Sequence, residues 1–120
     1  MSQWALATLV SGNSDQTRIV VEHGALEVFK QRLGDGVLRV RDEALRGIGN
    51  IAAGSVELRN VCLENGVMPL VLEMLTSSSL NSKRLAAWTV LNLCRGKPAP
   101  NRDDVRSCIP VMVECLKNEL

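Results

Sequence analysis

Apolar residues recur at steps of three or four along most of the chain, which is the spacing of one face of an α-helix. Val37, Val40, Ala44, Ile48 and Ile51 follow this rule. The strict alternation of apolar and polar residues that indicates a half-buried strand is absent. Glycines and polar residues interrupt the pattern, which predicts helices over residues 14–23, 25–34, 37–53, 55–65, 67–77, 80–95, 102–108 and 110–119.

The helical pattern repeats with a period of 42 residues. Three sets of positions share this spacing: Trp4, Arg46 and Trp88; Thr8, Asn50 and Asn92; Gly24 and Gly66. The pair Ile109-Pro110 follows Met68-Pro69 at a spacing of 41. The sequence therefore contains three copies of one unit, and residues 3–11 resemble the last helix of a further unit.

Residues that favour helix ends separate the helices within each unit. Gly24 and Gly66 suit the left-handed turn that follows a helix, and Pro69 suits a first helical turn. Three polar residues can accept hydrogen bonds from the first amides of a helix: Asn13, Ser55 and Asn101. Each unit is therefore predicted to hold a short helix, a second helix and a longer third one.

Three helices in about 42 residues is typical of the armadillo repeat, in which stacked units share one core. We expect a single all-α domain over residues 1–120, a right-handed α-solenoid of about two full repeats. The repeats are predicted at 13–54 and 55–96, with partial repeats at 1–12 and 97–120. Because uncapped repeat ends expose apolar surface, we expect a segment of a longer superhelix that self-associates through its ends.

Composition and charge disfavour several classes of partner. Fourteen Lys and Arg residues against thirteen Asp and Glu give a net charge of +1, without the basic excess that binding to a nucleic-acid backbone needs. No apolar run approaches the roughly 20 residues of a membrane span. We therefore expect neither a nucleic acid nor a membrane as partner, and a chain located in the cytoplasm or nucleus.

No residue pattern predicts catalysis, a metal or a cofactor. The four cysteines are widely spaced without a CxxC pair, and the chain has one histidine, so a zinc site is the disfavoured alternative to buried, reduced thiols. That histidine, His23, has no nucleophile or partner base nearby in the sequence. We expect a non-enzymatic protein.

Polar and aromatic residues form a ladder along the predicted third helices. Trp88 and Asn92 are one turn apart on the same face. An Asn amide can both donate to and accept from the backbone of an extended peptide, and an indole can stack against a Lys or Arg stem. The corresponding positions are Asp42, Arg46 and Asn50 in the preceding unit, and Trp4 and Thr8 in the first. The alternative is that the tryptophans only fill the core.

Several stretches resemble the importin alpha family: Trp4-Ala5-Leu6-Ala7-Thr8, Ser11 to Thr17, Gly49-Asn50-Ile51-Ala52, and above all Ala87 to Pro98. The resemblance covers nearly the whole chain and implies the N-terminal half of that family's armadillo array. It implies an adaptor for nuclear import that binds Lys/Arg-rich nuclear localisation signals in an extended conformation. By the same resemblance, Trp4, Trp88, Asn50 and Asn92 match the ladder, and Gly12 and Thr17 match the pocket for the most deeply held lysine.

The chain departs from the family at three positions: Thr8 replaces Asn, Arg46 replaces Trp, and Gly54 replaces an acidic residue. The alternative function is accordingly a scaffold fragment with a degenerate groove, which mediates protein–protein contacts without binding the signal. A repeat module of the junctional or ubiquitin-ligase type would share the solenoid but not the stretch from Trp88 to Pro98.

Overall fold

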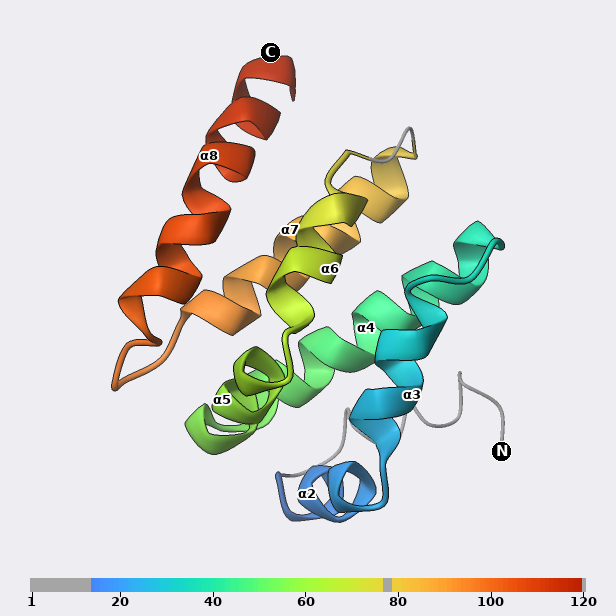
Figure 1. Cartoon of the computed structure of the whole chain (residues 1–120), viewed down its shortest axis with the longest axis vertical. Helices are drawn as coiled ribbons and strands as arrows, with labels where there is room; N and C mark the ends of the chain where they lie inside the picture. Colours follow the sequence, from blue (N-terminus) through green and yellow to red (C-terminus); the bar gives the residue numbers. More distant parts are fainter. Residues whose placement is uncertain (1–13, 77–78, 120) are drawn as a thin grey trace.

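The computed structural model describes residues 14–76 and 79–119, whose helices step across the molecule as a staggered array (Figure 1). They are α2 (Ser14–Glu22), α3 (Ala25–Arg32), α4 (Leu38–Gly54), α5 (Val56–Glu64), α6 (Val67–Met74), α7 (Leu80–Cys94) and α8 (Arg102–Glu119). No strand occurs in these ranges. The all-α solenoid predicted from the sequence is confirmed. The candidate residues Trp4, Thr8 and Gly12 lie outside the described residues.

The turns between the first and second helices of each full repeat follow the predicted glycines. Gly24 has φ 95° and Gly66 has φ 73°, both left-handed. This conformation costs glycine little and other residues more, which is why each glycine ends one helix and begins the next. The next repeat begins at Ser55, whose hydroxyl accepts a hydrogen bond from the Leu58 amide at 3.1 Å, as predicted for a helix cap.

The prediction of two helices at 102–108 and 110–119 is wrong, because the structure has one continuous helix, α8. In the 41-residue alignment, Ser107 stands where Gly66 makes its left-handed turn. Without a glycine the chain stays helical through Pro110, although proline removes one backbone donor. The Ser107 hydroxyl donates to the Asp104 carbonyl at 2.8 Å, so this side chain supports the helix instead of ending it.

The third helices, α4 and α7, lie side by side and run in the same direction (Figure 1). Four apolar side chains of α4 are fully buried: Ala44, Leu45, Ile48 and Ile51. The first and second helices cover one side of this layer, and Val67 and Val71 of α6 are also fully buried. Neither repeat encloses a core alone, so the apolar layer is continuous from one repeat to the next.

Arg59 of α5 is buried, with 1% of its surface exposed. Its Nη1 donates to the carbonyl oxygens of Arg95 at 2.9 Å and Gly96 at 3.5 Å, just beyond the end of α7. The guanidinium also donates to Asn60 Oδ1. Because the C-terminus of a helix carries partial negative charge, a buried cation there is stabilised without a carboxylate. Arg59 thereby fixes the start of the loop that leads to α8.

We expect Gly47→Ala to destabilise the fold. A Cβ at position 47 would collide with the ring of Phe29, which is fully buried and cannot move aside. Overpacking of this kind costs about 1–3 kcal/mol, more than the roughly 1 kcal/mol that alanine gains over glycine within a helix. Gly36→Ala is the control, because its Cβ would meet nothing within 4 Å. Urea unfolding followed by circular dichroism measures both; equal midpoints would contradict the argument.

Candidate functional site

Polar side chains of α7 donate to acceptors on α4 along the contact between the two third helices. The Ser82 hydroxyl donates to Asp42 Oδ1 at 2.6 Å, and Asn81 donates to the other carboxylate oxygen at 3.4 Å. Further along, the Thr89 hydroxyl contacts the Leu45 carbonyl at 3.1 Å. These bonds fix how α7 lies against α4, and with it the surface that the two helices present together.

Trp88 packs against the backbone of α4 at Gly49. A Cβ at position 49 would collide with the six-membered ring of this indole, so only glycine allows the contact. The Trp88 side chain still leaves 37% of its surface exposed. The indole therefore belongs to α7 and packs against α4, and part of its surface stays exposed to solvent.

Asn92, predicted to share a ladder face with Trp88, is buried, with 1% of its surface exposed. Its Nδ2 donates to the Gly49 carbonyl oxygen at 3.2 Å. The absence of a side chain at Gly49 lets α7 lie close enough to α4 for this bond, which encloses the amide. Within the part of the chain that the structure describes, Asn92 Oδ1 has no hydrogen-bond partner.

Thr17, matched by resemblance to a lysine pocket, is also fully buried. It lies near Gly54, since a Cβ at position 54 would be 3.9 Å from Thr17 Cγ2 and 3.1 Å from Leu58 Cδ1. The structure thus brings Thr17 close to Gly54, but Thr17 itself does not face solvent. Asn50, the partner of Asn92 in the preceding repeat, is half-buried.

The charged ladder residues of α4 are paired. Arg46 is exposed and its Nη1 donates to Glu43 Oε1 at 3.0 Å, a contact between residues one turn apart. Among the described residues, the other oxygen, Glu43 Oε2, is buried without a hydrogen-bond partner. Asp42 is held by Ser82 and Asn81. The arginine at the tryptophan position therefore lies over a carboxylate that has one oxygen uncommitted.

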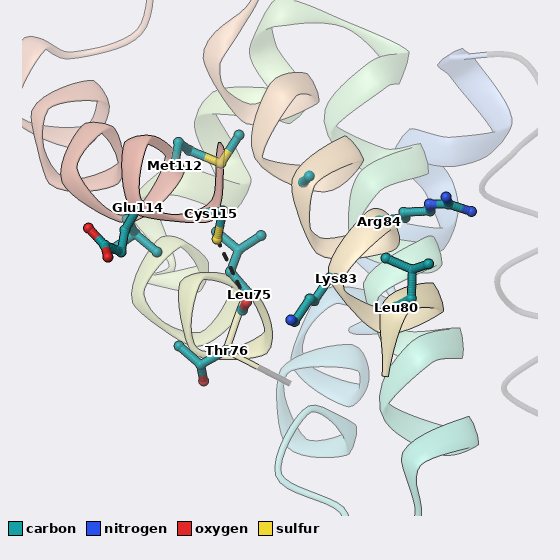
Figure 2. Close-up of a pocket in the computed structure, with 10 residues that line it drawn as sticks. Leu75, Thr76, Leu80, Lys83, Arg84, Met112, Glu114 and Cys115 are labelled. Carbon is teal, nitrogen blue, oxygen red and sulfur yellow. Dashed lines mark hydrogen bonds between the residues drawn. The ribbon is translucent and has the colours of Figure 1, made fainter. Parts of the chain in front are cut away.

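The face of α7 turned away from α4 is open. Leu91 of α7, which occupies the position that Gly49 has in α4, is 58% exposed. A cavity of about 790 Å³ lies between α6, α7 and α8, and Figure 2 shows Lys83 of α7 directed toward Leu75, with Cys115 of α8 close to Leu75. Arg84, one turn before Trp88, also borders this cavity.

Sequence reasoning missed Gly49, Ser82 and Thr89, the residues that hold α7 against α4. A glycine inside a predicted helix was the available signal, since it costs stability without a packing reason. Ser82 and Thr89 gave no signal, because only the placement of α7 on α4 decides which polar residues meet. No group of three or more His, Cys, Asp or Glu side chains in the described ranges is arranged to hold a metal ion. No helix there is long and apolar enough to cross a membrane.

We expect Asn92→Leu to leave the free energy of unfolding unchanged or to increase it. Leucine has a similar shape and eliminates a buried, unpaired acceptor that costs about 1–3 kcal/mol, against one lost hydrogen bond of about 1 kcal/mol. Asn92→Asp, in contrast, places a charge beside the Gly49 carbonyl and should destabilise. Urea titration of both variants measures this, and a loss above about 2 kcal/mol for Asn92→Leu would show that the amide is a structural requirement.

The chain is similar to importin alpha subunits over most of its length. It is 39% identical over 110 residues to importin subunit alpha-2 of Arabidopsis thaliana, covering 91% of this chain and 21% of that protein. It is 35% identical over 117 residues to importin subunit alpha-1b of Oryza sativa, covering 97% and 22%. The chain thus spans about a fifth of the length of these relatives.

Solved structures of designed solenoids have the same fold. A designed armadillo repeat protein in complex with the peptide (KR)4 superposes with a TM-score of 0.82 at 27% identity, covering 97% of this chain and 47% of that one. Another designed armadillo repeat protein superposes with a TM-score of 0.79 at 25% identity, covering 92% and 44%. The Armadillo/beta-catenin-like repeat model matches residues 13–53 and 55–95. Since these matches cover more than half of the sequence, the chain belongs to the armadillo-repeat family.

Proposed function

We propose that this chain is a non-enzymatic peptide-binding module that holds a Lys/Arg-rich segment extended along α4 and α7. The observation that carries the proposal is the Trp88 indole, fixed on Gly49 yet partly exposed. An indole face attracts a cation with about 0.5–1 kcal/mol at an exposed site. The aliphatic stem of a lysine or arginine can lie along the same ring.

Among the described residues, the third helices carry two buried acceptors and one buried donor, Arg41 Nε, without hydrogen-bond partners, and a peptide supplies both donors and acceptors. Asn92 Oδ1 and Glu43 Oε2 are both buried, and neither has a hydrogen-bond partner among the described residues. Backbone N–H groups, ammonium and guanidinium groups are donors. Asn92 can bind the peptide only if the contact between α4 and α7 that encloses it opens. The peptide therefore contacts Trp88 first and the Asn92 amide afterwards.

The relatives support the same class of ligand. The relatives are importin alpha subunits, and a designed armadillo repeat protein with this fold forms a complex with the peptide (KR)4. We accordingly propose nuclear localisation signals of cargo proteins as the partners, and cytoplasm and nucleus as the location. The peptide-binding residues of the proposed site are Trp4, Thr8, Gly12, Thr17, Asp42, Arg46, Asn50, Trp88 and Asn92.

The second candidate function is a scaffold with a degenerate groove. It is favoured by the burial of Asn92 and Thr17 and by Arg46 at the position of an indole. In that case the partner of the chain is a folded protein surface, and basic peptides do not bind. The two functions make opposite predictions for one titration.

We expect the chain to bind a labelled Lys/Arg octapeptide with an affinity that falls as salt is added, because screening weakens exposed charge contacts. Trp88→Ala should weaken binding about two- to fivefold, because it removes a cation-binding face that contributes about 0.5–1 kcal/mol. Leu91→Ala is the matched control, because it is an exposed apolar residue of the same helix. Fluorescence anisotropy gives the affinities. No binding at millimolar peptide, or equal losses in both variants, supports the scaffold function.

We expect Arg46→Trp to strengthen binding of the same peptide roughly tenfold, about 1.4 kcal/mol. The substitution removes a like charge, adds an indole and releases Glu43 Oε1 from its ion pair. Arg32→Trp, at the exposed end of α3, is the control for a general effect of adding tryptophan and losing a charge. Isothermal titration measures the peptide affinity of the unmodified chain and of both variants. An equal gain in affinity in the two variants would mean that the added tryptophan attracts the peptide nonspecifically.

A further inference from the structure

The corner between α7 and α8 brings two thiols into contact. Cys94 is the last residue of α7 and Cys108 lies in the second turn of α8, with their sulfur atoms 3.7 Å apart. Both cysteines are free. The other two have different surroundings: Cys62 is buried in the core, and the Cys115 thiol donates to the Leu75 carbonyl at 3.7 Å.

We propose that Cys94 and Cys108 are a redox-sensitive modification site, which closes to a reversible disulfide when a small disulfide such as oxidised glutathione is present. A disulfide joins sulfur atoms about 2.05 Å apart, so an approach of about 1.7 Å completes the bond. Side-chain rotation supplies such a movement, and the thiols sit on separate helices that the bond would link.

The segment between the two cysteines is anchored near each end. Arg59 holds the carbonyl oxygens of Arg95 and Gly96, directly after Cys94. Asn101 Oδ1 accepts from the Asp103 amide at 2.9 Å and fixes the first turn of α8, one turn before Cys108. The two sulfurs are therefore held close by contacts that do not involve the thiols, which lowers the entropy lost when the bond closes.

The exchange takes place in two steps. Cys94 is half-buried and Cys108 is buried, so the Cys94 thiolate attacks a sulfur of oxidised glutathione and releases one glutathione thiolate. The Cys108 thiolate then attacks Cys94 Sγ in the mixed disulfide and releases the second. Two protein S–H bonds are lost, one S–S bond forms, the leaving thiolates take up the two protons, and oxidised glutathione is reduced to two thiols.

The surroundings of Cys94 make this reaction slow at neutral pH. Burial, the neighbouring Cys108 and the charge of Asp104 raise the pKa of the Cys94 thiol to about 12, while the Arg59 guanidinium acts in the opposite direction. Below this pKa the thiolate fraction rises about tenfold for each pH unit, and the rate should follow it. The site would thus respond to sustained oxidation and not to brief exposure.

The disulfide would fix one wall of the cavity shown in Figure 2. Val111, Met112 and Cys115 of α8 line that cavity opposite α7, and Cys108 lies one turn before Val111 and Met112 on the same helix. Joining Cys108 to the end of α7 restricts how far α8 can move from it. Oxidation would then hold the third repeat in the position that the structure shows.

The test is peptide mapping after incubation with oxidised glutathione between pH 7 and 9. Trypsin releases Cys94 within residues 85–95 and Cys108 within 107–117, which also contains Cys115, so the experiment uses the Cys115→Ser chain. We expect a loss of about two mass units, a cross-link between these two peptides, and a thermal midpoint at least about 4 °C higher, all reversed by dithiothreitol.

Two single variants separate this site from general thiol reactivity. In a chain with Cys108→Ser, the reaction should stop at a glutathione adduct on Cys94, whereas Cys62→Ala should leave the cross-link unchanged. A stable glutathione adduct as the end product with both thiols present would overturn the proposal. So would a cross-link to Cys62, or no reaction at pH 9.

Discussion

The contact between α4 and α7 is the constraint on which the rest of the structure depends. At Gly49 the missing side chain lets a whole indole, Trp88, pack on the backbone of the neighbouring repeat, and one turn later Asn92 donates to the carbonyl of the same glycine. Apolar burial alone would allow neighbouring helices to slide, because it is not directional. The directional bonds from Ser82, Thr89 and Asn92 select one placement, so the spacing of the third helices is set by polar groups within an apolar layer.

Much of the fold was predictable because the period of the repeat and the spacing of apolar residues are local properties. The left-handed turns at Gly24 and Gly66 follow from the residues themselves. The helix break that we expected before Pro110 does not occur. Ser107 takes the place of the glycine, a serine adopts a left-handed turn less readily, and its hydroxyl supports the helix. Proline within a pattern was therefore a weaker signal for a helix end than the glycine that precedes it in the other repeats.

The candidate site was less predictable than the fold. The sequence spacing of Trp88 and Asn92 places them on one face of α7. Whether that face is exposed depends on the distance between α4 and α7, which Gly49 of α4 sets. Asn92 is thus enclosed while Trp88 keeps an exposed surface. Arg59 gave no signal either, since its role depends on a helix end that lies more than thirty residues further along the chain. Residues 1–13 hold three of the predicted site residues and lie outside the described part of the chain.

Two buried acceptors without hydrogen-bond partners among the described residues bear on the proposed site. A buried acceptor without a donor costs stability, and folded proteins tolerate few of them. Asn92 Oδ1 and Glu43 Oε2 occur on neighbouring third helices, the two elements that the repeat brings side by side. A ligand that supplies donors to both would recover free energy already lost in folding, which is a way to bind an extended chain with little new apolar area. The same unpaired acceptors would weaken a purely structural scaffold, because apolar residues at these positions would pack without that cost.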